Sequence, residues 1–251
     1  MKSGTILYTA LLGNYDELKE HKHPRGLSFC FTNLRGVKSE SWTLVPCDIP
    51  FHSIDERIRT ARFLKTQPHR VLPRHQHSIW IDASMQISGA IEVALSYLNS
   101  HGIATFKYPD IYGKRTCAYD EASACIQRGK DASDTINSQM RRYREEGFPA
   151  NYGLAETTIV VRENTVRVAR FNDAWWSEIA GGSRRDQLSF DYSCWRQGVK
   201  YNWLPGHRLQ NCFARYIQHK ERLYSGCPYT TINVPAKRDL RRRGDNAKNK
   251  D

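Results

Sequence analysis

The feature that most constrains the fold is the alternation of strand-like and helix-like segments in the first half of the sequence. Short apolar runs at 6–11, 28–32 and 42–45 each lead into a turn signal made by glycine, asparagine or proline. A helix-like stretch at 53–66 follows, and a further apolar run at 77–81 comes after it. Strands that alternate with helices are typical of proteins in which helices cover the faces of a sheet. We therefore expect the α/β class.

The helix-like stretch carries both an amino-terminal cap and a charged face. Ser53 is followed three residues later by Glu56, which is the spacing of a capping box. Arg59 and Arg62 are three residues apart and therefore share one face of the helix. Together with Lys65, these arginines are candidates for contacts to phosphate or ribose. The alternative is a charged helix face that only contacts solvent.

An acidic residue stands directly after the apolar run at 77–81. In open α/β sheets, ligands bind at the carboxyl ends of the strands. Asp82 is therefore better placed for chemistry than an acid in the middle of a helix. The alternative is that Asp82 only caps the following turn.

Two earlier strand ends carry residue types that suit a nucleotide. The segment 9–16 leaves the first strand through Gly13, and a glycine lets the backbone approach a ligand closely. The second strand ends at Thr32 and Asn33, whose side chains can form hydrogen bonds with a base or ribose. The candidates for nucleotide binding at these two ends are Thr9, Gly13, Tyr15, Thr32 and Asn33.

The later part of the chain holds a second group of charged residues. The segment 183–190 places two arginines and Asp186 in front of an apolar element. Just before it, we expect Trp175, Trp176 and Ile179 to pack beneath a loop, and Gly181 and Gly182 follow them.

The chain is strongly basic, with a formal net charge of +12. Such an excess favours an anionic partner, which could be nucleotide phosphate, nucleic acid, an acidic glycan or a membrane surface. Part of the charge lies near the carboxyl terminus. We expect residues 1–235 to form one α/β domain and residues 236–251 to form a basic tail that is disordered or loosely docked.

The seven cysteines are irregularly spaced and form no C-x-x-C pair, which argues against a zinc knuckle or a thioredoxin-like motif. This pattern is typical of reduced thiols and indicates a cytoplasmic protein. The sequence has no apolar stretch near the ~18 residues of a membrane span. We expect residues 1–12 to lead into the first strand rather than to act as a signal peptide.

Several short motifs occur in an order that one family shares. They are Gly13-Asn14-Tyr15-Asp16, Arg59/Arg62/Lys65 followed by Pro68-His69, Trp80-Ile81-Asp82, Arg115–Ala122, Gln139-Met140 with Tyr143, Gly147-Phe148-Pro149, Gly153–Glu156 and Arg185–Phe190. In these motifs, which span roughly residues 5–205, the sequence resembles the glycosyltransferase-like family that includes plant mucilage-related proteins and bacterial and phage members. The resemblance implies a GT-A type fold, with a single mixed sheet flanked by helices.

The resemblance also implies a metal site. GT-A enzymes neutralise the leaving nucleoside diphosphate with Mn²⁺ or Mg²⁺ held by an Asp-x-Asp motif, and oxygen ligands suit these cations. By resemblance, Asp82 is the first acid of that motif, whereas Ser84 stands where the second acid would be. Ser84 could bind through its hydroxyl or through water, and His207 could complete the metal shell. A metal-free enzyme that uses arginines is the alternative.

The motif Arg185-Asp186-Gln187 stands where the resemblance implies an acid on the acceptor side. If the reaction inverts the anomeric carbon, Asp186 is the expected general base and Glu156 is the second candidate. Arg185 is expected to contact the nucleotide sugar. In the alternative interpretation, Asp186 forms a structural ion pair with Arg184 or Arg185.

Taken together, these features predict a glycosyltransferase that moves a sugar from a nucleotide diphosphate sugar to a hydroxyl group, with a glycan as the expected acceptor. DNA with hydroxylated bases is the alternative acceptor, because the basic charge suits a polyanion. A non-catalytic protein that binds polyanions is a further alternative, although the sequence has no recognised nucleic-acid-binding motif.

Overall fold

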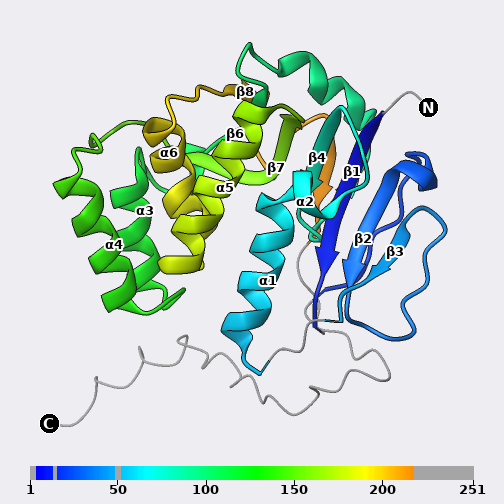
Figure 1. The fold of residues 1–251 in the computed structure, drawn as a ribbon, viewed down its shortest axis with the longest axis horizontal. Coiled ribbons are helices and arrows are strands. Elements are labelled where there is room, and N and C mark those ends of the chain that lie inside the picture. The colour runs from blue at the N-terminus through cyan, green and yellow to red at the C-terminus, as the bar shows by residue number, and fades with distance from the viewer. Residues whose placement is uncertain (1–3, 14–15, 49–51, 218–251) are drawn as a thin grey trace, which may run out of the picture.

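The computed structural model describes residues 4–13, 16–48 and 52–217, and a seven-stranded mixed sheet forms its centre (Figure 1). Its strand order is β3-β2-β1-β4-β7-β6-β8. The strands are β1 Thr5–Leu11, β2 Ser28–Thr32, β3 Thr43–Pro46, β4 His77–Ile81, β6 Ile103–Lys107, β7 Ala155–Glu163 and β8 Asn202–Leu204. Only β7 runs antiparallel to its neighbours, β4 and β6. The expected α/β fold with a GT-A-like sheet is confirmed.

Helices cover the sheet, and α1, α5 and α6 lie over the face turned toward the viewer in Figure 1. The helices α3 and α4 lie beyond α6, on the side away from β2 and β3. The α-helices are α1 Ile54–Thr66, α2 Pro68–Val71, α3 Ala118–Gln127, α4 Ser133–Glu145, α5 Val166–Gly181 and α6 Asp186–Arg196. The 3₁₀ helices are η1 Arg25–Leu27, η2 Ile91–Tyr97 and η3 Asp110–Tyr112. The strands β5 Met85–Ile87 and β9 Ala214–Tyr216 form a separate two-stranded sheet.

The cap at the start of α1 agrees with the sequence prediction. The backbone N–H of Glu56 donates to the Ser53 hydroxyl at 3.1 Å, and the Glu56 carboxylate accepts from the N–H of His52. At its other end, α1 stops before Pro68, which becomes the first residue of the short helix α2. Proline suits this position because it lacks the N–H that the first turn leaves unpaired. The helix α1 thus returns the chain from β3 to the start of β4.

The alternation of side chains along the strands divides the core into two layers. On the face covered by α5 and α6, Tyr8 and Trp80 pack with residues such as Phe171 and Phe190. On the opposite face, the core includes residues such as Ile79. Side chains that follow Trp80 at a spacing of two residues therefore lie on the α5/α6 face.

One sequence prediction about this core is wrong. Trp175, Trp176 and Ile179 do not pack beneath a loop, because all three belong to α5. Thr165 caps that helix, since its hydroxyl accepts the N–H of Val168. The buried residues of α5 include Val168, Phe171, Trp175 and Ile179, which repeat every three or four positions. The basic tail expected at residues 236–251 lies outside the described residues.

Asp191 ties α6 to the sheet through a carboxyl group that is 0% exposed. The backbone N–H of Ala155, at the start of β7, donates to its Oδ2 at 2.9 Å, and the hydroxyl of Tyr201 donates to Oδ1. Burial raises the pKa of Asp191 to about 6, although the two hydrogen bonds oppose the rise. The carboxyl group is therefore harder to ionise in the folded protein than in the unfolded chain.

We expect Asp191→Asn to change how stability depends on pH. Between about pH 4 and pH 6, the folded protein keeps a proton on Asp191 that the unfolded chain, with an ordinary pKa of 3.8, has released. The contribution of this group to the free energy of unfolding therefore falls as pH rises through that window. Above about pH 6 it stays constant.

Urea unfolding of wild type and variant across this window gives the measurement. Burial lowers the pKa of His21, His69 and His75, which act in the opposite direction, so the difference between the two proteins must be compared. That difference should shift in favour of the variant by about 1–3 kcal/mol as pH rises from about 4 to 6. A difference that does not change with pH would contradict this account.

Candidate functional site

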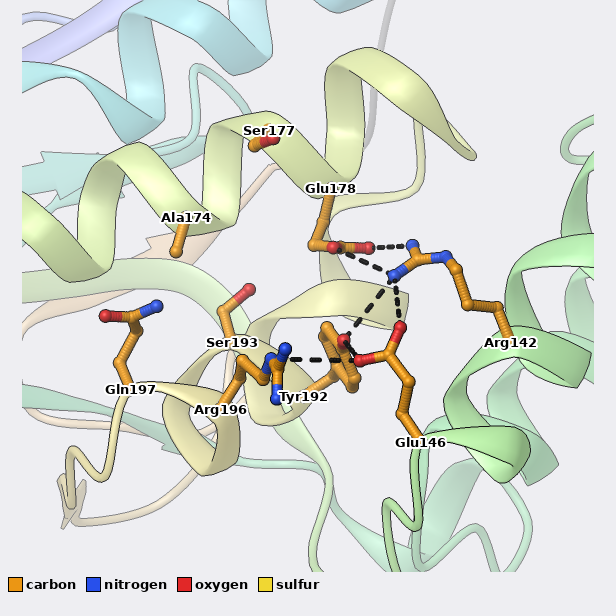
Figure 2. A pocket seen from close by; sticks show the side chains of 9 residues that line it. All are labelled: Arg142, Glu146, Ala174, Ser177, Glu178, Tyr192, Ser193, Arg196 and Gln197. Carbon is orange, nitrogen blue, oxygen red and sulfur yellow. Dashed lines mark hydrogen bonds and ion pairs between the residues drawn. The ribbon is translucent and has the colours of Figure 1, made fainter.

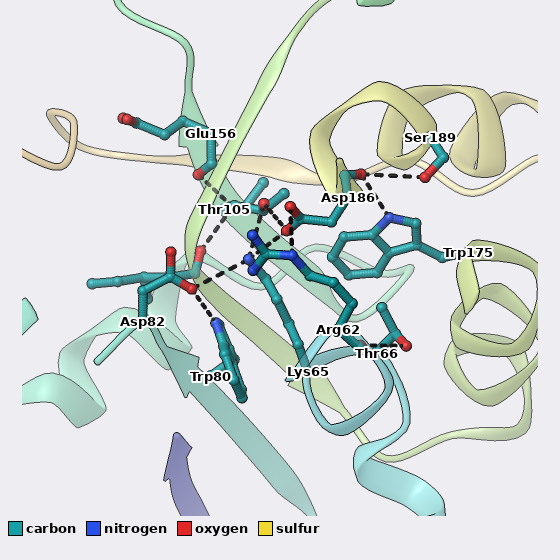
Figure 3. Close-up of polar contacts among 12 residues, drawn as sticks. Arg62, Lys65, Thr66, Trp80, Asp82, Thr105, Glu156, Trp175, Asp186 and Ser189 are labelled. Atoms are coloured by element: carbon teal, nitrogen blue, oxygen red, sulfur yellow. Dashed lines mark hydrogen bonds and ion pairs between the residues drawn. The ribbon is translucent and has the colours of Figure 1, made fainter. Parts of the chain in front are cut away.

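Asp82 directly follows β4 and lies at the carboxyl end of that strand (Figure 3). Its Oδ1 accepts the indole N–H of Trp80 at 2.7 Å and lies 3.4 Å from Nζ of Lys65. The Asp82 side chain is 26% exposed, and its Oδ2 has no hydrogen-bond partner among the described residues. One carboxylate oxygen is therefore held in place while the other is available to a ligand.

Lys65 is a buried cation that joins two carboxylates. Its Nζ lies 2.6 Å from Oδ2 of Asp186, 3.1 Å from the hydroxyl oxygen of Thr157 and 3.4 Å from Oδ1 of Asp82. Its side chain is only 1% exposed. An ammonium group has three N–H donors, and three oxygen atoms surround this one. A contact between Lys65 and phosphate remains a prediction, and it would require one of these oxygen atoms to be displaced.

Asp186 is the most strongly paired acid of the site. Its Oδ1 lies 3.1 Å from Nε of Arg62, and its Oδ2 accepts the Thr157 hydroxyl at 2.9 Å. Burial alone would raise the pKa of Asp186, but the positive charges of Arg62, Lys65 and Arg185 outweigh burial and hold the pKa far below its usual range. A carboxylate with so little affinity for a proton is a weak general base. The geometry therefore favours a structural ion pair, but its partners are Arg62 and Lys65, while Arg184 pairs with Asp55 and Asp131. The role of Asp186 as a base remains a prediction.

Glu156 has the opposite electrostatic environment. It lies near the start of β7, it is 5% exposed, and its carboxylate accepts the N–H of Arg208 at 3.1 Å and pairs with the Arg208 Nε at 3.3 Å. Burial raises the pKa of Glu156, and the nearby negative charges of Asp82 and Glu121 add to the rise, while Arg208 opposes it. Glu156 therefore holds a proton more readily than an ordinary glutamate does.

Gly13, Thr32 and Asn33 lie together at the ends of β1 and β2. The N–H of Gly13 donates to Oδ1 of Asn33 at 2.9 Å, and the Thr32 hydroxyl accepts the N–H of Leu34 at 3.1 Å. Gly13 has a φ of +70°, and a side chain there would collide with that of Arg57. Because β1 runs parallel to β4, these residues occupy the same edge of the sheet as Asp82.

The structure does not bring every candidate to this edge. Thr9 is buried within β1, and Tyr15 lies outside the described residues. Arg59 donates to the carbonyl oxygens of Ile179 and, at 3.0 Å, Gly182, so it binds the carboxyl end of α5. Its neighbour on the same helix face, Arg62, pairs instead with Asp186.

Arg185 immediately precedes α6 and contributes positive charge to two buried acids, Asp186 and Glu121. Burial would lower the pKa of this guanidinium, but the two acids and Cys125 raise it. Arg185 therefore extends the charged cluster from α6 toward α3.

The expected metal ligands supply only part of a coordination shell. Among the described residues, no group of three or more His, Cys, Asp or Glu side chains could hold a metal ion. Ser84 is buried, and His207 lies between β8 and β9, where its backbone pairs with Gln210. Mg²⁺, however, is commonly bound by one or two carboxylates with phosphates and water. The free oxygen of Asp82 fits a cation of this kind that arrives together with a diphosphate.

Three residues of the site were not identified from the sequence: Trp80 as the partner of Asp82, Thr157, and Arg208. The contact between Trp80 and Asp82 could have been predicted from the sequence, because residues two apart in a strand share a face. No sequence pattern predicts that Thr157 and Arg208 belong to the site, since their positions depend on the register of β7 and on the path of the chain after β8.

Comparison with known proteins supports the family resemblance. Residues 38–221 match the model of the TOD1/MUCI70 family, described as a glycosyltransferase-like domain. The chain is also 27% identical over 153 residues to the probable hexosyltransferase MUCI70 of Arabidopsis thaliana, a match that covers 58% of this chain. The match covers 26% of that protein, so the chain corresponds to about a quarter of its relative. No helix among the described residues is long and apolar enough to cross a membrane.

We expect Asp186→Asn to destabilise the protein strongly. The substitution leaves Arg62 and Lys65 without their buried counter-charge, and breaking a buried pair in this way costs about 3–5 kcal/mol. Chemical denaturation measures the loss. The matched control is Asp173→Asn, because Asp173 pairs with Arg70 at 2.9 Å while its side chain is 44% exposed. The control should lose about 1 kcal/mol or less. Equal losses in the two variants would show that the buried cluster is not structural.

Proposed function

The chain belongs to the TOD1/MUCI70 family of glycosyltransferase-like domains, and on that premise we propose that it transfers a sugar from a nucleotide diphosphate sugar to a hydroxyl group of a glycan. Asp82 is the observation that carries the proposal. One of its carboxylate oxygens is fixed by Trp80 and Lys65 at the end of β4, and the other is available at the edge where α/β proteins bind ligands.

In this proposal, different residues at this edge of the sheet bind different parts of the nucleotide sugar donor. Asp82 would hold Mn²⁺ or Mg²⁺ against the diphosphate, and a cation bound there would supply positive charge to the leaving group. Gly13, Thr32 and Asn33 contact the nucleoside, because they lie at the ends of β1 and β2 beside β4. The buried ammonium of Lys65 fixes the orientation of Asp82.

We assign the general base to Glu156 rather than to Asp186. An efficient base has a pKa near the working pH, and burial raises the pKa of Glu156 toward that range. The cations around Asp186 move its pKa in the opposite direction. Glu156 would accept the proton of the acceptor hydroxyl as the glycosidic bond forms and the nucleoside diphosphate leaves.

The first test measures donor binding by thermal melting with UDP, GDP, CDP and ADP, each with and without Mn²⁺. One nucleotide should stabilise the protein only when Mn²⁺ is present, by ~2.7 kcal/mol at a hundred times its dissociation constant. That corresponds to ~2–4 °C in the melting temperature of a chain of this size. Without ligand, the Asp82→Asn variant should have the same melting temperature as wild type. With the nucleotide and Mn²⁺, the variant should not show the rise in melting temperature that wild type shows.

The absence of a shift with all four nucleotides would contradict the transferase proposal. If the protein instead binds DNA, and this binding weakens with salt but does not change when nucleotide or Mn²⁺ is added, the result would favour a polyanion-binding protein.

A second test separates the two acids. We expect Glu156→Gln to lower the release of nucleoside diphosphate from the matching nucleotide sugar by about 10²–10⁴-fold, because the amide cannot take a proton. The affinity of the variant for the donor should stay within about twofold of the wild-type affinity, which is a small change in binding free energy. The rise of turnover with pH should also disappear. Parallel losses of turnover and donor binding would instead make Glu156 a structural residue.

A further inference from the structure

A cavity of about 450 Å³ lies against the helices α3 and α4. It is lined by residues from the start of α3, by Arg144 near the end of α4 and by residues of the segment between α4 and β7. Because β7 is antiparallel to β4 and β6, β7 begins at the edge where β4 and β6 end. The segment that leads into β7 therefore approaches the edge that carries the candidate donor site, and the volume of the cavity is within the range of small-ligand pockets.

Arg144 supplies unused hydrogen-bond donors to this cavity. Its guanidinium lies 4.5 Å from the centre of the Tyr119 ring, and it pairs with no carboxylate among the described residues. Arg142, two residues earlier on α4, differs in this respect. Figure 2 shows its guanidinium bound to both Glu146 and Glu178 in a smaller cavity between α4, α5 and α6. The ring of Tyr119 thus holds a positive charge at the cavity without neutralising it.

Asp120 and Asn151 complete the polar lining. Oδ2 of Asp120 accepts the N–H and the hydroxyl of Thr116 at 2.7 and 2.9 Å, and these bonds lower the pKa of Asp120, so the carboxylate is ionised. The oxygen of the same hydroxyl lies 2.6 Å from the side-chain amide of Asn151, so Thr116 joins Asp120 to Asn151. Asn151 also has a φ of +59°, a left-handed conformation that asparagine adopts more readily than most residues.

The opposite charges of Asp120 and Arg144 disfavour a charged ligand in this cavity. The carboxylate of Asp120 repels an anion, and the guanidinium of Arg144 repels a cation. A neutral molecule with several hydroxyl groups satisfies both, because each hydroxyl both donates and accepts. Tyr119 lines the same cavity, and the neighbouring Tyr152, which packs against the buried Phe148, is 40% exposed. Aromatic rings of this kind pack against the apolar C–H face of a sugar ring.

We propose that this cavity binds a neutral sugar unit of the acceptor glycan. The assignment to an acceptor rests on the proposed transferase function, whereas the sugar-binding site itself rests on the lining residues.

The test is an NMR titration of isotope-labelled protein with five neutral monosaccharides: glucose, galactose, mannose, xylose and rhamnose. At least one should shift the amide signals of Cys117, Asp120, Gly147 and Asn151, and glucuronate and glucosamine should bind more weakly. Arg144→Met keeps a side chain against Tyr119 but removes the charged donors, so affinity should fall about 10–100-fold. The matched control is Arg141→Met on the same helix, whose side chain is 72% exposed and which should bind like wild type.

The proposal is overturned if no neutral sugar shifts these signals, if glucuronate shifts them most, or if Arg144→Met binds as well as wild type. The same sample separates this proposal from the transferase function when the four nucleoside diphosphates are added with Mg²⁺. Nucleotide shifts at Gly13 and Asp82 without sugar shifts at the cavity would contradict only the cavity. Sugar shifts without any nucleotide shift would contradict only the donor site.

Discussion

The buried ammonium group of Lys65 is the interaction on which the rest of the site depends. It lies 2.6 Å from Asp186 and 3.4 Å from Asp82, so one side chain of α1 reaches the first residue of α6 and the end of β4. A buried charge is stable only when it is paired and hydrogen-bonded. The three elements therefore hold one another in position through charge as well as through the apolar layer beside them.

This arrangement gives two aspartates different chemistry. Asp186 contacts Arg62, Lys65 and Thr157, which use its acceptor capacity and keep it ionised. Asp82 shares one oxygen with Trp80 and Lys65 and keeps the other available. Lys65 also offsets part of the negative charge of Asp82, which weakens its attraction for a cation alone. In the proposed donor site, a cation that arrives with a diphosphate would bring its own ligands, so that a single carboxylate would suffice.

Much of this could be predicted from the sequence, because strand ends have a strong local signal. Asp82, Gly13 and Asn33 each follow an apolar run, and parallel strands bring such ends to one edge. The hydrogen-bond and ion-pair partners of the charged side chains were less predictable. Arg59 and Arg62 share one face of α1, yet the first binds the end of α5 and the second pairs with Asp186, because the position of α5 relative to α1 depends on packing between distant segments.

The errors have physical causes as well. The helical spacing of Phe171, Trp175 and Ile179 was present in the sequence, but the prediction did not use it and placed Trp175 and Ile179 beneath a loop. For Asp186, the sequence allowed either a base or an ion pair, and only the three-dimensional structure shows how many cations surround it. The motif around Tyr119 could be matched to a family but not given a role, since Arg144 and Asn151 reach it from other parts of the chain.

The most direct test of the donor site uses the paramagnetism of Mn²⁺. With the nucleoside diphosphate that stabilises the protein, trace Mn²⁺ should broaden the amide signals around Asp82 and Glu156 and leave those of α4 unchanged. Asp82→Asn should abolish the effect. Broadening centred elsewhere, or unchanged in the variant, would contradict the claim that Asp82 holds a cation against the diphosphate at the end of β4.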